Sequence, residues 1–343
     1  MDRRYTLYFE AAYSVSVREE ACPQPGRDEV LVQTAVSAIS GGTESLIYRG
    51  QMPAQMAADE TIKALAGELT YPLAYGYAAV GAVIACGDDV DDSWLGRQVF
   101  AFQPHTSHFV ARPADLLPLP PGMSPETAVF LPNMETAVSF LMDGHPMIGE
   151  QVIVLGQGIV GLLTTALLAR LPLTSLVTLD AHPLRRHWSQ QLGAHVALDP
   201  ATAAAADIVA ALAPTAADAY QGADLVYELS GNPQALTTAL AVVGYNGRIL
   251  IGSWYGQKRA DLDLGGRFHR QHITIRSSQV SHIAPQWQGR WHKPRRLQVA
   301  WQQLQQHRPE RLITQRVPLA QAHDAYRRLD KSPETAVQIL FTY

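Results

Sequence analysis

The chain has 343 residues, of which 47% are hydrophobic and 17% charged, and its 27 basic and 31 acidic residues give a formal net charge of −4. This length and balance suit two globular domains, and the lack of a long basic run argues against nucleic-acid binding. No run reaches the ~18–20 uninterrupted apolar residues of a membrane span, no signal sequence is evident, and neither Cys22 nor Cys86 lies in a disulfide or metal-binding pattern. We therefore expect a soluble, cytoplasmic protein that binds neither nucleic acid nor membrane.

Residues 1–130 contain short β-like runs that glycine and proline interrupt at close intervals. The clearest of these runs are residues 30–36, 79–84 and 97–102. This spacing predicts a compact β-rich domain rather than βαβ repeats. A helix is expected next, over residues 125–141, with Ser124 as its N-cap and Pro125 in its first turn.

From residue 151 onward, apolar strands alternate with helical patterns. Strands are expected at residues 152–155, 176–179, 225–229 and 248–251, with helices beginning at Ile159, Pro183 and Pro233. This alternation is typical of a doubly wound parallel sheet, and residues 272–275 are expected to form its last strand. The Ala-rich residues 201–219 predict a surface helix with a loop.

Beyond Pro285 the sequence predicts a polar helix over residues 294–307 and a final strand at residues 337–341. The short basic cluster at residues 290–296 is interpreted as the solvated start of that helix. Taken in order, these elements predict an α/β chain with a β-rich domain and a parallel-sheet domain.

The most specific motif is a glycine triplet, Gly156, Gly158 and Gly161, between an apolar strand and an apolar helix. In a dinucleotide-binding turn the first glycine permits the tight turn and the second lets the backbone approach the pyrophosphate. The third allows close packing of helix and strand. With Ile159 and Val160, the motif opens a helix whose N-terminus faces the phosphates.

Asp180 ends the next predicted strand, at the distance where dinucleotide-binding domains carry an acid. A carboxylate there accepts hydrogen bonds from the ribose hydroxyls and repels a 2′-phosphate, which favours NAD over NADP. Arg185 keeps NADP as the alternative, because an arginine nearby can accommodate that phosphate.

The ends of two further strands supply Ser230 with Gly231 and Gly252 with Ser253. Ligands of open α/β sheets lie at the carboxyl ends of strands, so these residues are candidates for the nicotinamide side, although each could be a simple turn residue. Trp254 and Tyr255 follow the last of these ends and are candidates for an aromatic wall, with packing at the domain interface as the alternative.

The order of these parts resembles the medium-chain dehydrogenase/reductase superfamily. The residues that carry the resemblance are 39–44, 76–81, the helix containing Thr136, the glycine motif and 224–252. The resemblance implies a GroES-like domain made of residues 1–130 and 285–343. It also implies an inserted Rossmann domain over residues 131–284, and a homodimer.

Zinc-dependent members carry a cysteine at a first position, a histidine with an acid at a second, and a further ligand at a third. This chain has other residues at all three positions. Ser40 or Gly41 occupies the first position, Tyr77 followed by Ala78 the second, and Pro132 the third. Catalytic zinc needs three thiolate, imidazole or carboxylate ligands, so the resemblance implies no zinc. The sequence is particularly similar to a zinc-free branch that includes bacteriochlorophyllide dehydrogenase and dehydrogenases found beside pterin-synthase homologues.

Without zinc, side-chain acids, bases and hydrogen-bond donors must handle the proton. The resemblance implies that Thr43 relays it, with an N-cap role as the alternative, and that Thr136 packs against the nicotinamide ring. Glu135 is a candidate base, with an ordinary surface glutamate as the alternative. Tyr77 would donate to a carbonyl or fill the space of the metal.

His105 and His108 lie on a loop that could line the cleft, with ordinary surface histidines as the alternative. Together these observations predict a zinc-independent, NAD(H)-dependent oxidoreductase that interconverts an alcohol and a carbonyl on a small polar metabolite, cyclic molecules included. The alternatives are an NADPH-dependent reductase of activated C=C bonds, against which Asp180 argues, and a non-catalytic NAD-binding protein.

Overall fold

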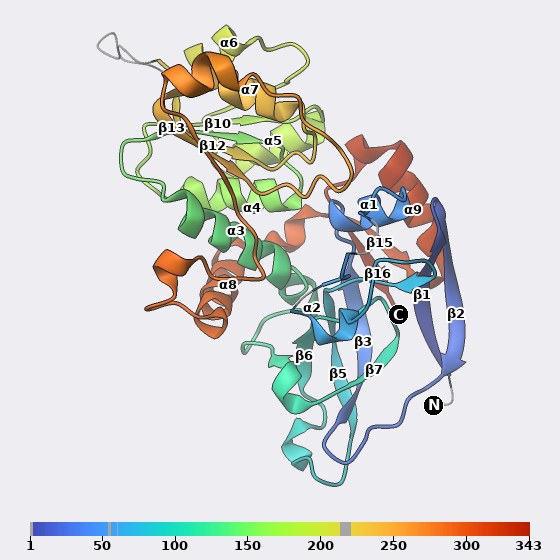
Figure 1. Ribbon diagram of the computed structural model, residues 1–343. Helices are drawn as coiled ribbons and strands as arrows, with labels where there is room; N and C mark the ends of the chain where they lie inside the picture. The colour runs from blue at the N-terminus through green and yellow to red at the C-terminus, as the bar shows by residue number, and fades with distance from the viewer. Residues whose placement is uncertain (1–2, 54–55, 60, 213–220) are drawn as a thin grey trace. The chain divides into compact units, whose positions relative to one another are not determined.

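The computed structural model describes residues 3–53, 56–59, 61–212 and 221–343. Contacts divide the chain into two compact units, Met1–Pro132 with Trp301–Tyr343 and Asn133–Ala300. We call the first the β-rich unit and the second the parallel-sheet unit. Their presence confirms the predicted α/β class, with a β-rich part at both ends of the sequence and a parallel sheet between them (Figure 1).

Two sheets build the β-rich unit. Its strands are β1 (Arg3–Ala11), β2 (Ser14–Ala21), β3 (Val30–Ala38), β4 (Leu73–Ala74), β5 (Ala79–Cys86), β6 (Gln98–Ala101), β7 (His108–Ala111), β8 (Leu117–Pro118), β15 (Ile313–Pro318) and β16 (Gln338–Thr342). The larger sheet has the order β15-β16-β3-β5-β6-β8, with β7 also paired to β3, and the smaller has the order β2-β1-β4. Strand β16 therefore joins the two sequence segments of this unit through its antiparallel pairing with β3.

Short helices connect these strands. They are α1 (Thr43–Tyr48), α2 (Pro125–Ala128) and α9 (Ala322–Lys331), with the 3-10 turns η1 (Lys63–Leu65), η2 (Asp92–Trp94), η3 (Pro113–Asp115), η6 (Pro309–Leu312), η7 (Leu319–Gln321) and η8 (Pro333–Thr335). A core that includes Val30, Val32, Val83 and Phe109 lies under the larger sheet. Burial of these side chains is the main source of stability in such a sheet.

The parallel-sheet unit contains strands β9 (Gln151–Leu155), β10 (Ser175–Leu179), β11 (Val196–Leu198), β12 (Ala223–Glu228), β13 (Val243–Ile251) and β14 (Thr274–Ser277). Their order is β11-β10-β9-β12-β13-β14, and every pairing is parallel. Counted from β9, this is the order 3-2-1-4-5-6 of the Rossmann fold, whose order reverses beside the first strand.

Helices cover both faces of the parallel sheet (Figure 1). They are α3 (Leu131–Gly144), α4 (Ile159–Leu168), α5 (Pro183–Gln191), α6 (Ala205–Ala210) and α7 (Ala235–Val242). The later elements are the π turn η4 (Leu264–Phe268), the 3-10 turn η5 (Pro285–Trp287) and α8 (Lys293–His307), which bonds to α3 through Arg296. One face packs on α6 and α7 through residues such as Ile208 and Leu236. The other packs on α3 through Phe140.

Several predicted boundaries were wrong. The helix predicted over residues 125–141 is two helices, α2 and α3, because Pro132 in the first turn of α3 has no N–H to continue the hydrogen bonds of α2. Ser124 does cap α2, accepting a bond from the Thr127 N–H at 3.1 Å. Strand β14 begins two residues later than predicted. Residues 213–219 of the predicted Ala-rich surface segment lie outside the described residues.

Residues 285–300, which the sequence analysis placed with the β-rich domain, make their contacts in the parallel-sheet unit. The Trp287 Nε1–H donates to the Met142 carbonyl at 3.0 Å, and Arg296 bonds to Glu135. The chain therefore returns to the β-rich unit in the middle of α8 rather than before it.

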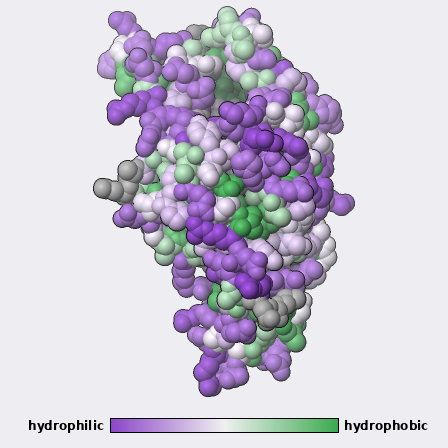
Figure 2. Space-filling view, turned by 90° about the vertical axis from the view of Figure 1, so that its right-hand side faces the viewer, coloured by the Kyte–Doolittle hydropathy of each residue, from purple (hydrophilic) through white to green (hydrophobic). Residues whose placement is uncertain are grey.

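On the face that Figure 2 shows, hydrophilic side chains predominate and apolar ones stand in small groups. Among the described helices, none combines the length and hydrophobicity needed to cross a membrane.

Candidate functional site

The glycine triplet forms the turn between β9 and α4. Gly156 has φ +93°, and a Cβ there would lie 2.5 Å from the Ser230 Cα; a Cβ on Gly161 would lie 2.0 Å from the Gly156 carbonyl oxygen. Nothing lies within 4 Å of the corresponding position on Gly158. The fold itself therefore requires glycine at 156 and 161, whereas the backbone at Gly158 is open to a ligand.

Gln157, between the first two glycines, is completely buried. Its backbone N–H donates to Asp180 Oδ2 at 2.7 Å, and its side-chain oxygen accepts a bond from Thr165 Oγ1 of α4 at 2.9 Å. These bonds fix the loop to the next strand end and to the helix. Sequence analysis missed this residue, because a glutamine at a variable position of the motif gives no signal.

Asp180 follows β10 and is almost fully buried. Besides the Gln157 N–H, its carboxylate accepts the His182 N–H at 2.8 Å, and Arg185 Nη1 lies 3.9 Å from Oδ2. A carboxylate has about four acceptor positions, so the two bonds to backbone N–H groups leave capacity for ribose hydroxyls. Burial lowers the pKa of Arg185, and the charge of Asp180 opposes this shift.

A buried acid, Glu228, ends β12, which pairs with β9 on the side opposite β10. Glu228 Oε1 accepts the Ser230 N–H at 2.8 Å, and Oε2 accepts the Tyr255 hydroxyl at 2.5 Å. The Gly231 N–H in turn donates to Ser253 Oγ at 2.8 Å. The structure therefore brings the candidates Ser230, Gly231 and Ser253 together around Glu228, which the sequence analysis had not selected as a site residue.

Gly252 follows β13 and packs against α3. A Cβ at this position would lie 2.2 Å from Phe140 Cζ, so any larger residue would clash with the Phe140 ring. Thr136 is half-buried on the same helix, one turn before Phe140. The predicted cofactor residues thus lie at the carboxyl ends of the parallel strands and on α3, in the region of this fold where nucleotides bind.

Glu135 is buried, so the alternative of a surface glutamate was wrong. Its Oε1 accepts bonds from Arg296 Nε at 3.1 Å and Nη2 at 2.8 Å, and Arg296 also donates to Ser139 Oγ at 2.9 Å. Burial raises the pKa of Glu135, and the charge of Arg296 opposes this rise. Arg296 is only 1% exposed, so the interpretation of residues 290–296 as a solvated helix start was wrong for this residue.

In the β-rich unit, three hydroxyl groups converge. The Tyr77 hydroxyl donates to Ser40 Oγ in a short hydrogen bond. Burial raises the pKa of Tyr77, and hydrogen bonds with Ser40 and Thr43 oppose this rise without cancelling it. The phenol is therefore protonated near neutral pH and can donate a proton. The alternative that Thr43 caps α1 was wrong, because Gly42 is the N-cap and no side chain bonds to the helix end.

The sequence analysis predicts that Ser40 or Gly41, then Tyr77, stand at two of the three zinc-ligand positions of zinc-dependent dehydrogenases. The third position, Pro132, has no donor atom, and Tyr77 and Ser40 use their oxygens on each other. Within the described ranges, no three His, Cys, Asp or Glu side chains are grouped to hold a metal ion. The donor set here does not fit a catalytic zinc ion.

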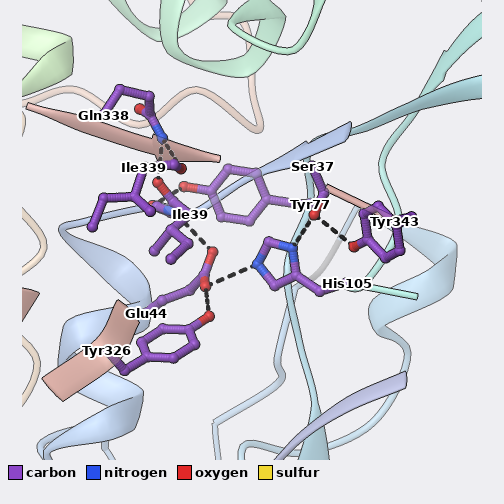
Figure 3. A network of polar contacts seen from close by, with 10 residues as sticks. Ser37, Ile39, Glu44, Tyr77, His105, Tyr326, Gln338, Ile339 and Tyr343 are labelled. Carbon is purple, nitrogen blue, oxygen red and sulfur yellow. Dashed lines mark hydrogen bonds and ion pairs between the residues drawn. The ribbon is translucent and has the colours of Figure 1, made fainter. Parts of the chain in front are cut away.

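Behind the hydroxyls lies a buried polar network (Figure 3). Glu44 and His105 are both completely buried, and His105 Nε2 lies 3.0 Å from Glu44 Oε2. Tyr326 also bonds to Glu44, and Ser37 bonds to His105. His108 is buried as well, so the alternative of two surface histidines was wrong.

Comparison with known proteins agrees with this geometry. Residues 160–293 match the sequence model of the zinc-binding dehydrogenase family. D-guloside 3-dehydrogenase of Escherichia coli K12 is 25% identical over 331 residues, covering 92% of this chain and 93% of the relative. L-threonine 3-dehydrogenase of Stenotrophomonas maltophilia is 25% identical over 272 residues, covering 71% of this chain and 74% of the relative.

The family model and the curated dehydrogenases support the predicted medium-chain dehydrogenase/reductase superfamily. The relatives are named dehydrogenases of alcohol groups, which confirms the predicted enzyme class, an NAD(P)-dependent oxidoreductase of the alcohol dehydrogenase type. The family match begins at Val160 and so excludes Ser40, Tyr77 and Pro132. Similarity to the zinc-free branch of this superfamily therefore stays a prediction.

Solved structures of several dehydrogenases share the fold. An Escherichia coli CFT073 protein described as a short chain alcohol dehydrogenase complexed with NADH superposes with a TM-score of 0.79 at 18% identity, and all of both chains is covered. A putative zinc-binding dehydrogenase of Sinorhizobium meliloti 1021 bound to NADP superposes with a TM-score of 0.78 at 18% sequence identity, and again all of both chains is covered. At these identities the likeness extends to the fold alone.

Proposed function

We propose that this enzyme interconverts an alcohol and a carbonyl with NAD(H) and without zinc. The observation that carries the proposal is the hydrogen bond from Tyr77 to Ser40, with Thr43 beside it, at residues that the resemblance aligns with two of the zinc-ligand positions. Nicotinamide supplies or accepts the hydride when it is bound. The remaining task of the protein is to move one proton and to stabilise charge on the substrate oxygen.

Tyr77 is the group suited to that task. Its half-buried phenol keeps its proton near neutral pH, so it can donate to the oxygen of a carbonyl during reduction. In oxidation the direction reverses: the Tyr77 oxygen receives the proton of the alcohol while Tyr77 passes its own proton to Ser40 Oγ, the acceptor of its hydrogen bond, and Ser40 releases a proton to water. Ser40 and the nearby Thr43 hydroxyl can stabilise charge on the phenol oxygen.

The residues around Asp180 support NAD rather than NADP. The carboxylate keeps acceptor capacity for ribose hydroxyls, and its charge opposes a 2′-phosphate. Arg185 lies against that carboxylate. Arg186 Nη1 donates to the carbonyl oxygens of Asp180 and Ala181 at 2.8 and 2.9 Å, so both nearby arginines already have partners in the protein.

The relatives support a small polar substrate with several hydroxyl groups. The D-guloside dehydrogenase covers nearly the whole chain and is named for a sugar derivative, and L-threonine is likewise a small polar alcohol. We therefore propose a polyhydroxylated, ring-containing metabolite as the substrate class. The homodimer and the cytoplasmic location stay predictions.

A binding and metal experiment tests this function. Chelator-treated, metal-analysed protein is titrated with NADH and NADPH by nicotinamide fluorescence, and turnover is then screened on sugar derivatives and polyols. We expect tighter binding of NADH and turnover without stoichiometric zinc. Activity that requires one zinc per chain would contradict the proposal. Tighter NADPH binding would point to a C=C reductase, and absence of turnover would point to a binding protein.

A matched pair of variants tests the role of Tyr77. Tyr77→Phe removes the phenol, and we expect kcat to fall by about 10²–10⁴-fold, the usual contribution of a general acid–base group. Tyr75→Phe is the control, because Tyr75 is a buried neighbour whose ring lies 6.2 Å from that of Tyr77. Equal kcat values for the two variants would remove Tyr77 from the mechanism.

A further inference from the structure

The carboxylate of Glu44 holds the turn that carries two of the three hydroxyls. Its Oε1 accepts the Ser40 N–H at 2.8 Å, and the Glu44 N–H donates to the Ser40 carbonyl at 2.9 Å. The side chain and backbone of Glu44 thus close residues 40–44 into a hydrogen-bonded turn. Thr43 belongs to this turn, next to Glu44, so the carboxylate fixes the positions of both Ser40 and Thr43.

The ring of His105 holds the segment that carries the third hydroxyl. Gly76, immediately before Tyr77, has φ +128°, and a Cβ there would lie 2.9 Å from His105 Cδ2 and 3.0 Å from its Nε2. The His105 N–H also donates to the Tyr75 carbonyl at 3.2 Å. The imidazole therefore lies against the backbone from which Tyr77 projects, while its Nε2 faces Glu44 (Figure 3).

The hydrogen bonds of this network can be given one consistent direction. Glu44 Oε2 is an acceptor, so His105 Nε2 carries the proton that faces it and Nδ1 is left to accept. Ser37 Oγ, 2.6 Å from Nδ1, then donates to the ring and accepts from the Tyr343 hydroxyl at 2.7 Å. Each polar atom on this path has a partner, which fixes the orientation of the imidazole ring.

We propose that Glu44 and His105 are positioning residues that hold Ser40, Thr43 and Tyr77 together in place of a metal ion. This inference rests on the proposed zinc-independent function. Stability alone does not explain the pair, because a packed apolar pair of similar volume commonly stabilises a core as well as a buried ionic pair does. What an apolar pair cannot do is bind the Ser40 N–H and fix an imidazole against Gly76.

Substitution of Glu44 is the direct test, made on the whole chain with NADH. Glu44→Ala leaves the Ser40 N–H without its acceptor, and we expect kcat to fall about 100-fold, because small misplacements of reacting groups have effects of that size. KM and the Kd for NADH should change less than about twofold. Glu44→Gln keeps one oxygen for the Ser40 N–H but turns an amide NH2 toward His105, so it should recover only part of kcat.

A second readout follows Tyr77 without any substrate. In protein carrying isotope-labelled tyrosine, the Tyr77 ring signal is assigned by its loss in Tyr77→Phe. We expect this signal to move in Glu44→Ala and in Ser37→Ala, and to move less in Glu44→Gln, which keeps the bond to the Ser40 N–H. Thr106→Val is the control, because Thr106 is buried beside His105 and bonds to Thr6 at 2.9 Å without touching the hydroxyls.

A folded Glu44→Ala with wild-type kcat and an unmoved Tyr77 signal would overturn the inference. If Glu44→Ala does not fold, kcat and the Tyr77 signal are measured in Ser37→Ala and Glu44→Gln instead. Wild-type kcat together with an unmoved Tyr77 signal in Ser37→Ala would overturn the inference. Failure of the proposed function looks different, since wild-type activity would then require added zinc. The tyrosine signal would still report whether Glu44 and His105 position Tyr77.

Discussion

The two units differ in which part of the polypeptide carries the function. In the parallel-sheet unit the cofactor site depends on backbone shape, and the fold itself forbids a side chain at Gly156 and Gly161. In the β-rich unit the proposed site consists of side chains, the hydrogen-bonded hydroxyls of Tyr77 and Ser40. A backbone-built site resists change because substitution damages the fold, whereas a side-chain site can acquire a new chemistry inside the same strands.

The largest expected effect comes from breaking the backbone-built site. Gly161→Val would place side-chain atoms against the Gly156 carbonyl, where even a Cβ lies only 2.0 Å away, so we expect loss of NADH binding together with a lower melting temperature. Gly158→Ala is the matched variant, because a Cβ there meets nothing within 4 Å. This variant should have the melting temperature of the wild type but bind NADH more weakly than the wild type does, since the methyl group obstructs the pyrophosphate. Titration and thermal melting separate these results, and equal binding by both variants would contradict the comparison.

The second prediction concerns the buried ion pair of the parallel-sheet unit. Glu135→Leu leaves the Arg296 guanidinium buried without its carboxylate, which costs about 3–5 kcal/mol of unfolding free energy. The double variant Glu135→Leu/Arg296→Met should recover most of that loss, as chemical denaturation would measure. A stable single variant with a greatly reduced kcat would instead support the earlier prediction of Glu135 as the base.

A smaller effect is expected from Asp180→Asn. This change removes the charge but keeps an oxygen that can accept the Gln157 N–H. Hydrogen bonds to charged groups contribute about 1.5–3 kcal/mol, so we expect the preference for NADH over NADPH to shrink by about tenfold or more. The ratio of the two dissociation constants measures it, and an unchanged ratio would mean that Asp180 only holds the loop.

The smallest expected effect is a pH dependence in the β-rich unit. Burial lowers the pKa of His108 below its usual value near 6.5. The unfolded chain therefore takes up a proton before the folded one does, so this residue reduces stability as the pH falls through about 6.5. His108→Gln should show a smaller loss of melting temperature between neutral and mildly acidic pH. An identical loss in both proteins would assign the acid sensitivity to other groups.

Much of the fold could be predicted because its signals are local. Apolar runs such as residues 152–155 and 176–179 became β9 and β10, and the glycine motif opened α4 as expected. Helix boundaries were mispredicted where a single residue interrupts the backbone hydrogen bonds, as Pro132 does between α2 and α3.

The candidate site was predictable only in part, for a physical reason. Gln157, Glu228 and Arg296 acquire their roles from partners that are distant along the chain, as the pairing of Arg296 with Glu135 shows. Composition predicts such polar residues to be exposed. A lone histidine such as His105 gave no sign that Glu44 would lie 3.0 Å from its ring.

The interrupted β-rich unit has a consequence for synthesis on the ribosome. Strand β16 lies between β15 and β3, so the larger sheet stays incomplete until residues 338–342 have been made. The parallel-sheet unit, by contrast, is one continuous stretch that ends at Ala300. Since domains fold as units while the chain emerges, we expect the nucleotide-binding half to fold first. The larger sheet, whose strand β3 is made early, would then be completed only when β16 has been synthesised.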